Sequence, residues 1–222
     1  MTTLLSVLLA LAAIARPSEP VELRLELARD ASDLPILDLR ASLPGDGDGE
    51  TALALGLGWG GTDPQACDLE LTDVRGSDGT QLSWEHDGPG RWSVRHAPGA
   101  RLEVSARLAP TPHQADADPR VHYRPILNER VLQLVGELVV PLPEGLDGEL
   151  PRPVRVEWIG ADGLGWETAC SLGRGAGPFE VELPLDRLRS CLFVAGEFEL
   201  FEHAVPGGTL LVAAAGEEWG FD

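Results

Sequence analysis

Residues 131–140 read VLQLVGELVV, and this stretch decides the fold class. Aliphatic and β-branched side chains dominate it, only Gly136 interrupts it, and Pro141 and Pro143 follow it closely. β-branched residues favour strands, whereas proline cannot continue a sheet ladder. Because polar residues are sparse, we expect one long central strand with protein on both of its faces; a short buried helix is the alternative reading.

The segments around this strand alternate between apolar and polar residues. Residues 21–27, VELRLEL, place Glu22, Arg24 and Glu26 on one face and aliphatic side chains on the other, as in a half-buried antiparallel strand. We predict one helical turn at residues 185–189 and no helix longer than three turns after residue 20. The sequence therefore predicts an all-β fold, a mainly antiparallel two-layer β-sandwich. The other predicted strands span residues 36–43, 51–57, 68–74, 80–85, 91–95, 101–108, 154–158, 165–172, 178–183, 191–201 and 209–215.

The composition limits the possible partners. The 222 residues carry a formal net charge of −19, and all 17 basic residues are arginine. Neutralising phosphate groups needs a basic face, so the charge argues against nucleic acid and against anionic membrane surfaces. The length suits one β-sandwich domain over residues 16–222, with two sub-parts at about 20–110 and 120–222 as the finer division.

The N-terminus has the pattern of a secretory signal. Residues 4–15, LLSVLLALAAIA, are a compact apolar run that ends in a small-x-small sequence suited to signal peptidase. The run is too short to span a bilayer comfortably. We predict a signal peptide at residues 1–15 and an exported, periplasmic or extracellular mature chain. The first residues lack a positive charge, which leaves an uncleaved anchor or a misassigned start as alternatives.

Three cysteines lie in the mature part. Cys170 and Cys191 are closest in sequence and are the disulfide candidate in an oxidising compartment, which leaves Cys67 free. Zinc ligation is the alternative, but no C-x-x-C spacing supports it.

Only one polar cluster has a spacing suited to a hard metal ion. His113, Asp116, Asp118 and His122 lie in or beside the longest polar break, and we treat them as weak metal candidates against the commoner reading of a solvated loop. Residues 44–49, PGDGDG, resemble a calcium loop but lack the rest of its ligand set, so a plain turn is favoured. Neither H-E-x-x-H nor G-x-S-x-G occurs. We therefore expect a chain that is not an enzyme and holds no cofactor.

The six tryptophans offer a second kind of site. In exported β-sandwich modules, exposed tryptophans stack against sugars, whereas the alternative here is packing in the core. The residues are Trp59, Trp84, Trp92, Trp158, Trp166 and Trp219.

The second half of the chain resembles a known family. Its strand order and spaced aromatic residues are similar to those of the N-terminal β domain of the glycyl-aminopeptidase-like zinc metallopeptidases, which are exported and often carry a PDZ domain. The resemblance covers roughly residues 20–222 and is most convincing over 120–222. It rests on Arg124-Pro125, residues 131–140 with Gly136, 154–158, Gly165-Trp166, 185–188, 193–198, Gly216 and Trp219-Gly220-Phe221, with Trp92-Ser93-Val94 in the first half.

The resemblance implies a domain that packs beside a protease. In that family a thermolysin-like domain follows the β domain and brings the H-E-x-x-H helix, the third zinc ligand and the water-activating glutamate. None of those residues has a matching position here, so none is carried over. The expected function is a non-catalytic β domain that shapes the substrate cleft of a downstream or partner protease domain. The alternative is a free-standing exported module that binds glycan or protein.

Overall fold

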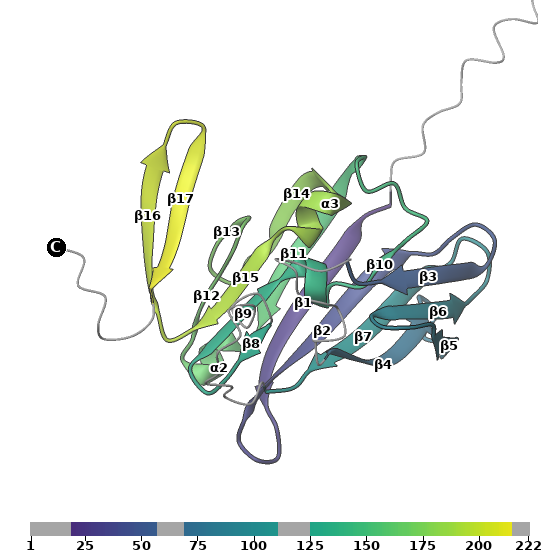
Figure 1. Cartoon of the computed structure of the whole chain (residues 1–222), viewed down its shortest axis with the longest axis horizontal. Helices are drawn as coiled ribbons and strands as arrows, with labels where there is room; N and C mark the ends of the chain where they lie inside the picture. Colours follow the sequence, from purple (N-terminus) through teal and green to yellow (C-terminus); the bar gives the residue numbers. More distant parts are fainter. Residues whose placement is uncertain (1–18, 57–68, 111–124, 215–222) are drawn as a thin grey trace, which may run out of the picture.

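The structure, a computed structural model, describes residues 19–56, 69–110 and 125–214. These residues lie mostly in strands, and the longest of their helices has five residues (Figure 1). The predicted all-β, mainly antiparallel class is therefore confirmed. The helices are α1 (Gly136–Val139), α2 (Ala161–Leu164) and α3 (Leu185–Arg189).

A six-stranded sheet forms the main layer. Its neighbouring strands are antiparallel except for β1 and β11, which run parallel and bring residues far apart in the sequence side by side. Their register pairs Val21 with Val154 and Leu25 with Trp158. The strands follow the order β14 (Phe179–Pro184), β11 (Pro151–Ile159), β1 (Val21–Arg29), β2 (Pro35–Pro44), β7 (Arg101–Leu108) and β4 (Leu69–Gly76).

Two smaller sheets lie toward opposite ends of the large one (Figure 1). The four-stranded sheet has the order β10 (Leu142–Pro143), β3 (Glu50–Ala54), β6 (Arg91–Arg95) and β5 (Ser83–His86). The five-stranded sheet has the order β13 (Gly173–Arg174), β12 (Glu167–Cys170), β15 (Leu192–Gly196), β9 (Val131–Val135) and β8 (Ile126–Leu127). β16 (Glu199–Val205) and β17 (Gly208–Ala214) form a separate hairpin.

One hydrophobic core joins the three larger sheets. Leu39 of the six-stranded sheet, Leu53 of the four-stranded sheet and Phe193 of the five-stranded sheet are all fully buried in it. Along β1, residues 21, 23, 25 and 27 are buried while the residues between them are more exposed, so the large sheet covers the core with one face and turns a polar face outward. The core includes residues from both of the proposed sub-parts.

The predicted strand at residues 131–140 is wrong beyond Val135. Gly136 begins the one-turn helix α1, and its N–H donates a hydrogen bond of 2.9 Å to the Cys191 carbonyl. The backbone passes so close to α3 that a Cβ atom on Gly136 would lie 2.5 Å from the Leu188 carbonyl oxygen. The chain therefore turns there and enters another sheet as β10, where Pro143 is tolerated because β10 is an edge strand.

The predicted strand at residues 191–201 is also two strands. β15 ends at Gly196, where a Cβ atom would lie 2.5 Å from the Arg130 carbonyl oxygen. The following N–H, from Glu197, donates to that same carbonyl. This contact directs the chain out of the five-stranded sheet and into the hairpin.

The calcium-like hexapeptide at residues 44–49 is a turn. The Asp46 N–H donates to the Thr51 hydroxyl at 2.8 Å, and the Asp46 carbonyl accepts from Gly99 at 2.9 Å. The Asp48 carboxylate accepts from the Glu50 N–H at 3.1 Å. Backbone and hydroxyl hydrogen bonds therefore account for its shape.

Candidate functional site: a charged hollow and an apolar hairpin

The outer face of the six-stranded sheet is lined with charged and hydroxyl side chains. It contains a hollow of about 790 Å³ over β1, β2, β4 and β7. Five arginines and four carboxylates line this hollow, so it carries a small excess of positive charge in a chain whose net charge is −19. The charged residues are Glu22, Arg24, Asp38, Arg40, Asp73, Arg75, Arg101, Glu103 and Arg107.

One cross-strand row runs through the middle of this face. Arg24 of β1 lies directly opposite Arg40 of β2, and Arg40 lies opposite Ser105 of β7. The row ends at Glu157 of β11 on one side and Asp73 of β4 on the other. Two like charges directly opposite each other destabilise a sheet, so the arginine pair is the unusual feature of the row.

The other charges of the hollow are largely paired with each other. Arg107 binds both carboxylate oxygens of Asp38, at 2.7 and 3.0 Å. The Asp38 hydrogen bond and charge raise the pKa of Arg107. Arg101 donates to the Ser42 hydroxyl at 2.7 Å and has Glu22 at 3.9 Å.

Arg24 and Arg40 have partners outside the hollow. Arg40 contacts Glu26 at 3.1 Å, and Arg24 contacts Glu157 at the long distance of 3.8 Å. Neither carboxylate lines the hollow, whereas both arginines do. The two arginine side chains are 53% and 60% exposed, so their guanidinium groups are accessible to a ligand.

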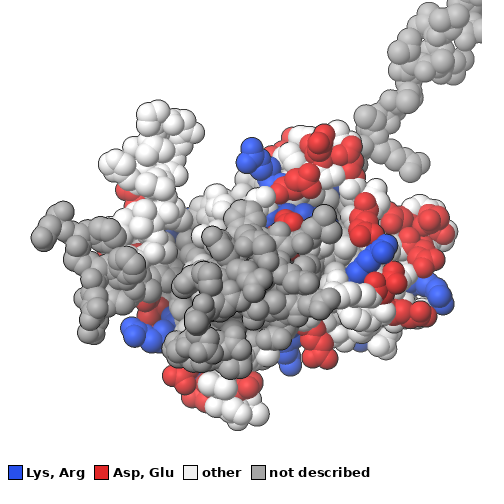
Figure 2. Space-filling model, in the orientation of Figure 1, with Lys and Arg blue, Asp and Glu red and all other residues white. Residues whose placement is uncertain are grey.

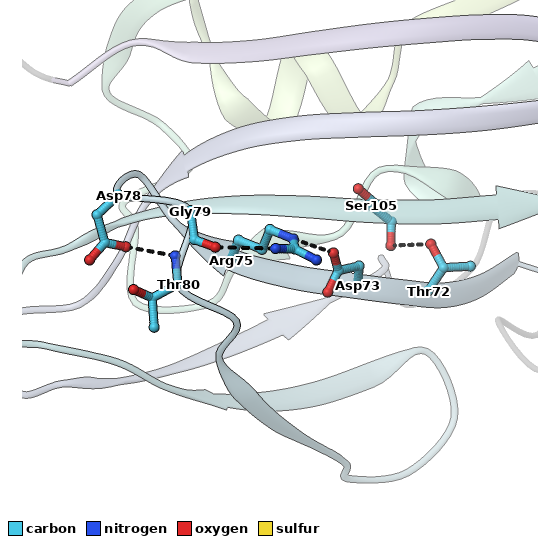
Figure 3. Close-up of polar contacts among 7 residues, drawn as sticks. All are labelled: Thr72, Asp73, Arg75, Asp78, Gly79, Thr80 and Ser105. Atoms are coloured by element: carbon cyan, nitrogen blue, oxygen red, sulfur yellow. Dashed lines mark hydrogen bonds and ion pairs between the residues drawn. The ribbon is translucent and has the colours of Figure 1, made fainter.

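Residues at a bulge in β4 line one side of the hollow. Figure 3 shows their polar contacts. The Asp73 carboxylate accepts from Arg75 at 2.6 Å, and Arg75 donates to the Gly79 carbonyl at 3.2 Å. Thr72 donates to the Ser105 carbonyl at 3.1 Å, which ties the bulge to β7. The second carboxylate oxygen of Asp73 is buried and accepts no hydrogen bond from the described residues.

The adjoining turn is held by Asp78. Its carboxylate accepts from the Thr80 N–H at 2.9 Å (Figure 3), and this backbone hydrogen bond lowers the pKa of Asp78. This hydrogen bond supports the turn that follows the β4 side of the hollow.

The β16–β17 hairpin is a second kind of surface. It stands away from the three larger sheets (Figure 1), and no residue of it belongs to the core. Phe201, Val205, Leu210 and Val212 are between 37% and 51% exposed. The register pairs Phe201 with Val212, His203 with Leu210 and Val205 with Gly208, which places all four apolar side chains on one face.

The hairpin is almost free of charge. Only Glu199 and Glu202 are acidic in it, and Figure 2 shows it white almost throughout, unlike the red and blue surface around β3 and β6. Exposed apolar faces of this kind are used for contacts between proteins, although His203 also lies on this one. We call Phe201, Val205, Leu210 and Val212 the hairpin face.

The predicted metal cluster, His113, Asp116, Asp118 and His122, lies outside the described residues, as does Cys67. Within residues 19–56, 69–110 and 125–214, no group of three or more His, Cys, Asp or Glu side chains is placed to hold a metal ion. The same residues include no helix long and apolar enough to cross a membrane.

The tryptophans that the structure describes do not form an exposed platform. Trp92, Trp158 and Trp166 are at most 5% exposed, and Trp84 is partly buried against the core. Trp59 and Trp219 lie outside the described residues. The core-packing reading therefore holds for the four described tryptophans.

Cys170 and Cys191 are both buried free thiols in the structure. Burial raises the pKa of each, and with the added effect of neighbouring Cys170 that of Cys191 reaches about 11. The register pairs Cys170 of β12 with Phe193 of β15, and Cys191 lies just before β15, so the two thiols are near one another.

Comparison with solved structures identifies the fold. An aminopeptidase N family protein from Idiomarina loihiensis matches with a TM-score of 0.66 and 13% sequence identity, over 89% of this chain and 32% of that chain. The chain has the fold of part of an aminopeptidase N family protein. A mutant M1 zinc metallopeptidase from Deinococcus radiodurans, bound to a Tyr-Ser-Ala substrate, matches this M1-type fold with a TM-score of 0.50 and 15% identity, over 93% of this chain and 49% of that chain.

The resemblance to zinc metallopeptidases of the aminopeptidase type is thus confirmed as a likeness of fold. The chain spans one third to one half of the length of these two proteins, which fits one domain of a larger peptidase. In sequence, no family model and no curated protein matches the chain.

Proposed function

We propose that the chain is the non-catalytic N-terminal β domain, or a truncated relative of it, of an exported M1-type metallopeptidase, and that it packs beside the peptidase domain and shapes its substrate cleft. The observation that carries the proposal is the M1-type fold, which covers 89% of this chain but only 32% of the Idiomarina protein. A zinc hydrolase needs about three protein ligands and a base near the metal-bound water. The sequence contains no H-E-x-x-H, and no group of three or more His, Cys, Asp or Glu side chains in the described residues is placed to hold a metal ion.

The hairpin face is the surface that contacts the peptidase domain. β16 and β17 have seven residues each, so at ~3.4 Å per residue and ~4.8 Å between strands one face measures roughly 24 by 10 Å. That area is well below the ~800 Å² per partner of a stable complex between free chains. A domain in the same polypeptide is held at a high effective concentration and tolerates such a small contact. The size therefore favours a linked peptidase domain over a second copy of this chain.

The test measures binding between residues 16–222 and the peptidase domain encoded downstream or in an adjacent gene of the source genome. We expect a 1:1 complex by size-exclusion chromatography and titration calorimetry. Phe201→Asp combined with Leu210→Asp should weaken it at least tenfold, because both side chains lie on the hairpin face. Leu150→Asp is the matched control, since Leu150 is 58% exposed but lies outside the hairpin.

Two outcomes separate the parts of this proposal. Full-strength binding by the hairpin variant would reject the hairpin face and leave the domain assignment standing. A source genome without a peptidase domain in either place would reject the assignment itself. A separate partner protein of another class would then support the alternative, a free-standing module that binds protein.

The non-catalytic assignment has its own assay. Residues 16–222 should carry no stoichiometric zinc and release no product from aminoacyl substrates, with or without a chelator. Zinc at one equivalent together with chelator-sensitive turnover would contradict the assignment.

Export is the remaining part of the proposal. It rests on the apolar run and small-x-small end of residues 4–15. Expression of the whole chain in a bacterial host should give a periplasmic product whose mass corresponds to a chain beginning at Arg16. An uncleaved product in the cytoplasm would contradict export.

A further inference from the structure

The middle row of the large sheet contains a pair of arginines that folding alone does not require. Arg24 and Arg40 are direct cross-strand neighbours, and like charges in such positions destabilise a sheet. Removing either charge would leave the buried faces of β1 and β2 unchanged, because both residues alternate with core positions. Glu157 and Glu26 offset part of the repulsion from outside the hollow, and an anion between the two guanidinium groups would offset it from inside.

The surroundings of the pair favour an anion. Most other charges of the hollow are paired: Asp38 is bound by Arg107, Asp73 by Arg75, and Arg101 lies near Glu22. The remaining carboxylate, Glu103, accepts a hydrogen bond from the Ser42 hydroxyl. Arg24 and Arg40 are compensated only from outside the hollow, by Glu157 and Glu26. Positive charge therefore faces the hollow at its centre.

The geometry also suits one small group. Arg24 and Arg40 lie on neighbouring strands ~4.8 Å apart, so both side chains can reach one carboxylate or phosphate group when they turn from Glu157 and Glu26 toward the hollow. Ser105, directly opposite Arg40 and lining the hollow, offers a hydroxyl as a third donor. Guanidinium groups bind planar carboxylate and phosphate oxygens with two parallel hydrogen bonds, which a point charge such as lysine does not provide.

We infer that Arg24 and Arg40 form a binding site for a small ligand with a carboxylate or phosphate group, held in the hollow on the outer face of the six-stranded sheet. The bound group lies between the two guanidinium groups and accepts from Ser105. No metal, cofactor or covalent step is involved. The site is independent of the hairpin face, which lies on another sheet.

The test titrates residues 16–222 with inorganic phosphate and, separately, with citrate, at low ionic strength. Binding is followed by nuclear magnetic resonance shifts of the arginine side chains and by the rise in unfolding temperature. We expect saturable binding of at least one probe at millimolar concentration or below. Which probe binds more tightly distinguishes a phosphate ligand from a carboxylate ligand.

Arg24→Gln combined with Arg40→Gln should weaken binding of the preferred probe at least tenfold. Ser105→Ala should weaken it by a smaller factor, about threefold. Arg95→Gln is the control: Arg95 is 68% exposed, forms an ion pair with Glu85, and lies on the four-stranded sheet away from the hollow. It removes a similar exposed guanidinium and should leave binding within twofold.

Three results would overturn the inference. The first is that neither probe shows saturable binding at 10 millimolar concentration, which is on the order of a weak ligand's dissociation constant. The second is unchanged binding in the double arginine variant. The third is an equal loss of binding in Arg95→Gln. Unfolding curves of each variant without ligand show whether it is folded. Because the assay needs no peptidase domain, its result does not depend on the proposed function.

Discussion

Gly136 is the residue at which the chain leaves the five-stranded sheet, and its missing side chain is required by packing. A Cβ atom there would lie 2.5 Å from the Leu188 carbonyl oxygen and 2.9 Å from that of Arg189. Both are backbone atoms, which cannot move away as a flexible side chain can. We predict that Gly136→Ala lowers the free energy of unfolding by about 1–3 kcal/mol, the usual cost of overpacking.

Gly163 supplies the matched control for this substitution. It lies in the short helix α2, and nothing lies within 4 Å of the position where its Cβ atom would be. Gly163→Ala should raise the free energy of unfolding by about 0.4–1 kcal/mol, because alanine restricts the unfolded chain. Urea unfolding of both variants measures the difference, and equal effects would contradict the packing argument.

Because its thiols are buried, the folded protein should lose stability at alkaline pH. Burial raises the pKa of Cys191 from 9.0 to about 11, so the folded state keeps a proton that the unfolded state loses. Stability should therefore be unaffected below pH 9 and should fall, by on the order of 2–3 kcal/mol in total, as the pH rises toward 11. The chain contains no lysine, so few other groups titrate in this range.

The measurement is the unfolding temperature between pH 7.5 and about 11 with a reducing agent present. Cys191→Ala should be less stable at pH 7.5, because it leaves a small cavity, but its stability should fall less steeply above pH 9. A parallel decline in both proteins would show that another group is responsible.

The disulfide between Cys170 and Cys191 stays a prediction. Cys170 ends β12 and Cys191 lies just before β15, the strand that pairs with β12, so the two thiols are close to one another. Oxidised glutathione should convert the two thiols to one disulfide, losing two hydrogen atoms while the glutathione disulfide is reduced to two thiols. Mass spectrometry of a tryptic digest should show the linked peptides; recovery of glutathione adducts alone would argue against the bond.

At the scale of elements, substitutions on the hairpin face should weaken partner binding without changing the free energy of unfolding. Because no residue of β16 or β17 belongs to the core, Phe201→Asp with Leu210→Asp should change the free energy of unfolding of the body by less than ~0.5 kcal/mol. Leu132→Ala, at a fully buried position of β9, should cost about 2–5 kcal/mol. Urea unfolding distinguishes the two, and a large loss in the hairpin variant would show that the hairpin is part of the folding unit.

Strands with one buried face were predicted with accurate ends. β1, β2 and β7 alternate strictly, and the predicted and observed ends agree within two residues. The two mainly apolar runs, residues 131–140 and 191–201, were predicted wrongly as single strands. In both, a glycine meets a distant backbone carbonyl, Leu188 at Gly136 and Arg130 at Gly196, and this contact depends on the tertiary fold.

The candidate site was only partly visible in the sequence. The alternation of residues 21–27 placed Arg24 on the polar face, but its neighbour Arg40 follows only from the β1–β2 register. The signal for that register is the turn between the strands, where Asp30 donates to the Leu34 carbonyl at 2.8 Å and its carboxylate accepts from Ser32. The sequence predicted strands for both arms of the hairpin but not their separation from the core.

At the scale of the whole molecule, the division into two sub-parts can be tested by truncation. Residues 16–110 contain most of the six-stranded sheet but lack β11 and the five-stranded sheet, which cover β1 and complete the core. We predict that this fragment does not fold to a cooperative unit, because it exposes an unpaired edge and much of the apolar face. A cooperative thermal transition of the fragment, followed by circular dichroism, would support two autonomous sub-parts.

The parallel pairing of β1 with β11 also has a consequence for how the protein is made. β1 leaves the ribosome early, yet its partner on one side is residues 151–159, so the central sheet cannot be completed until most of the chain has been synthesised. Sheets closed by such distant pairings fold slowly, since the entropy of a long loop is lost before the contact forms. We therefore expect the large sheet to be completed only after β11 has been synthesised, late in the production of the chain.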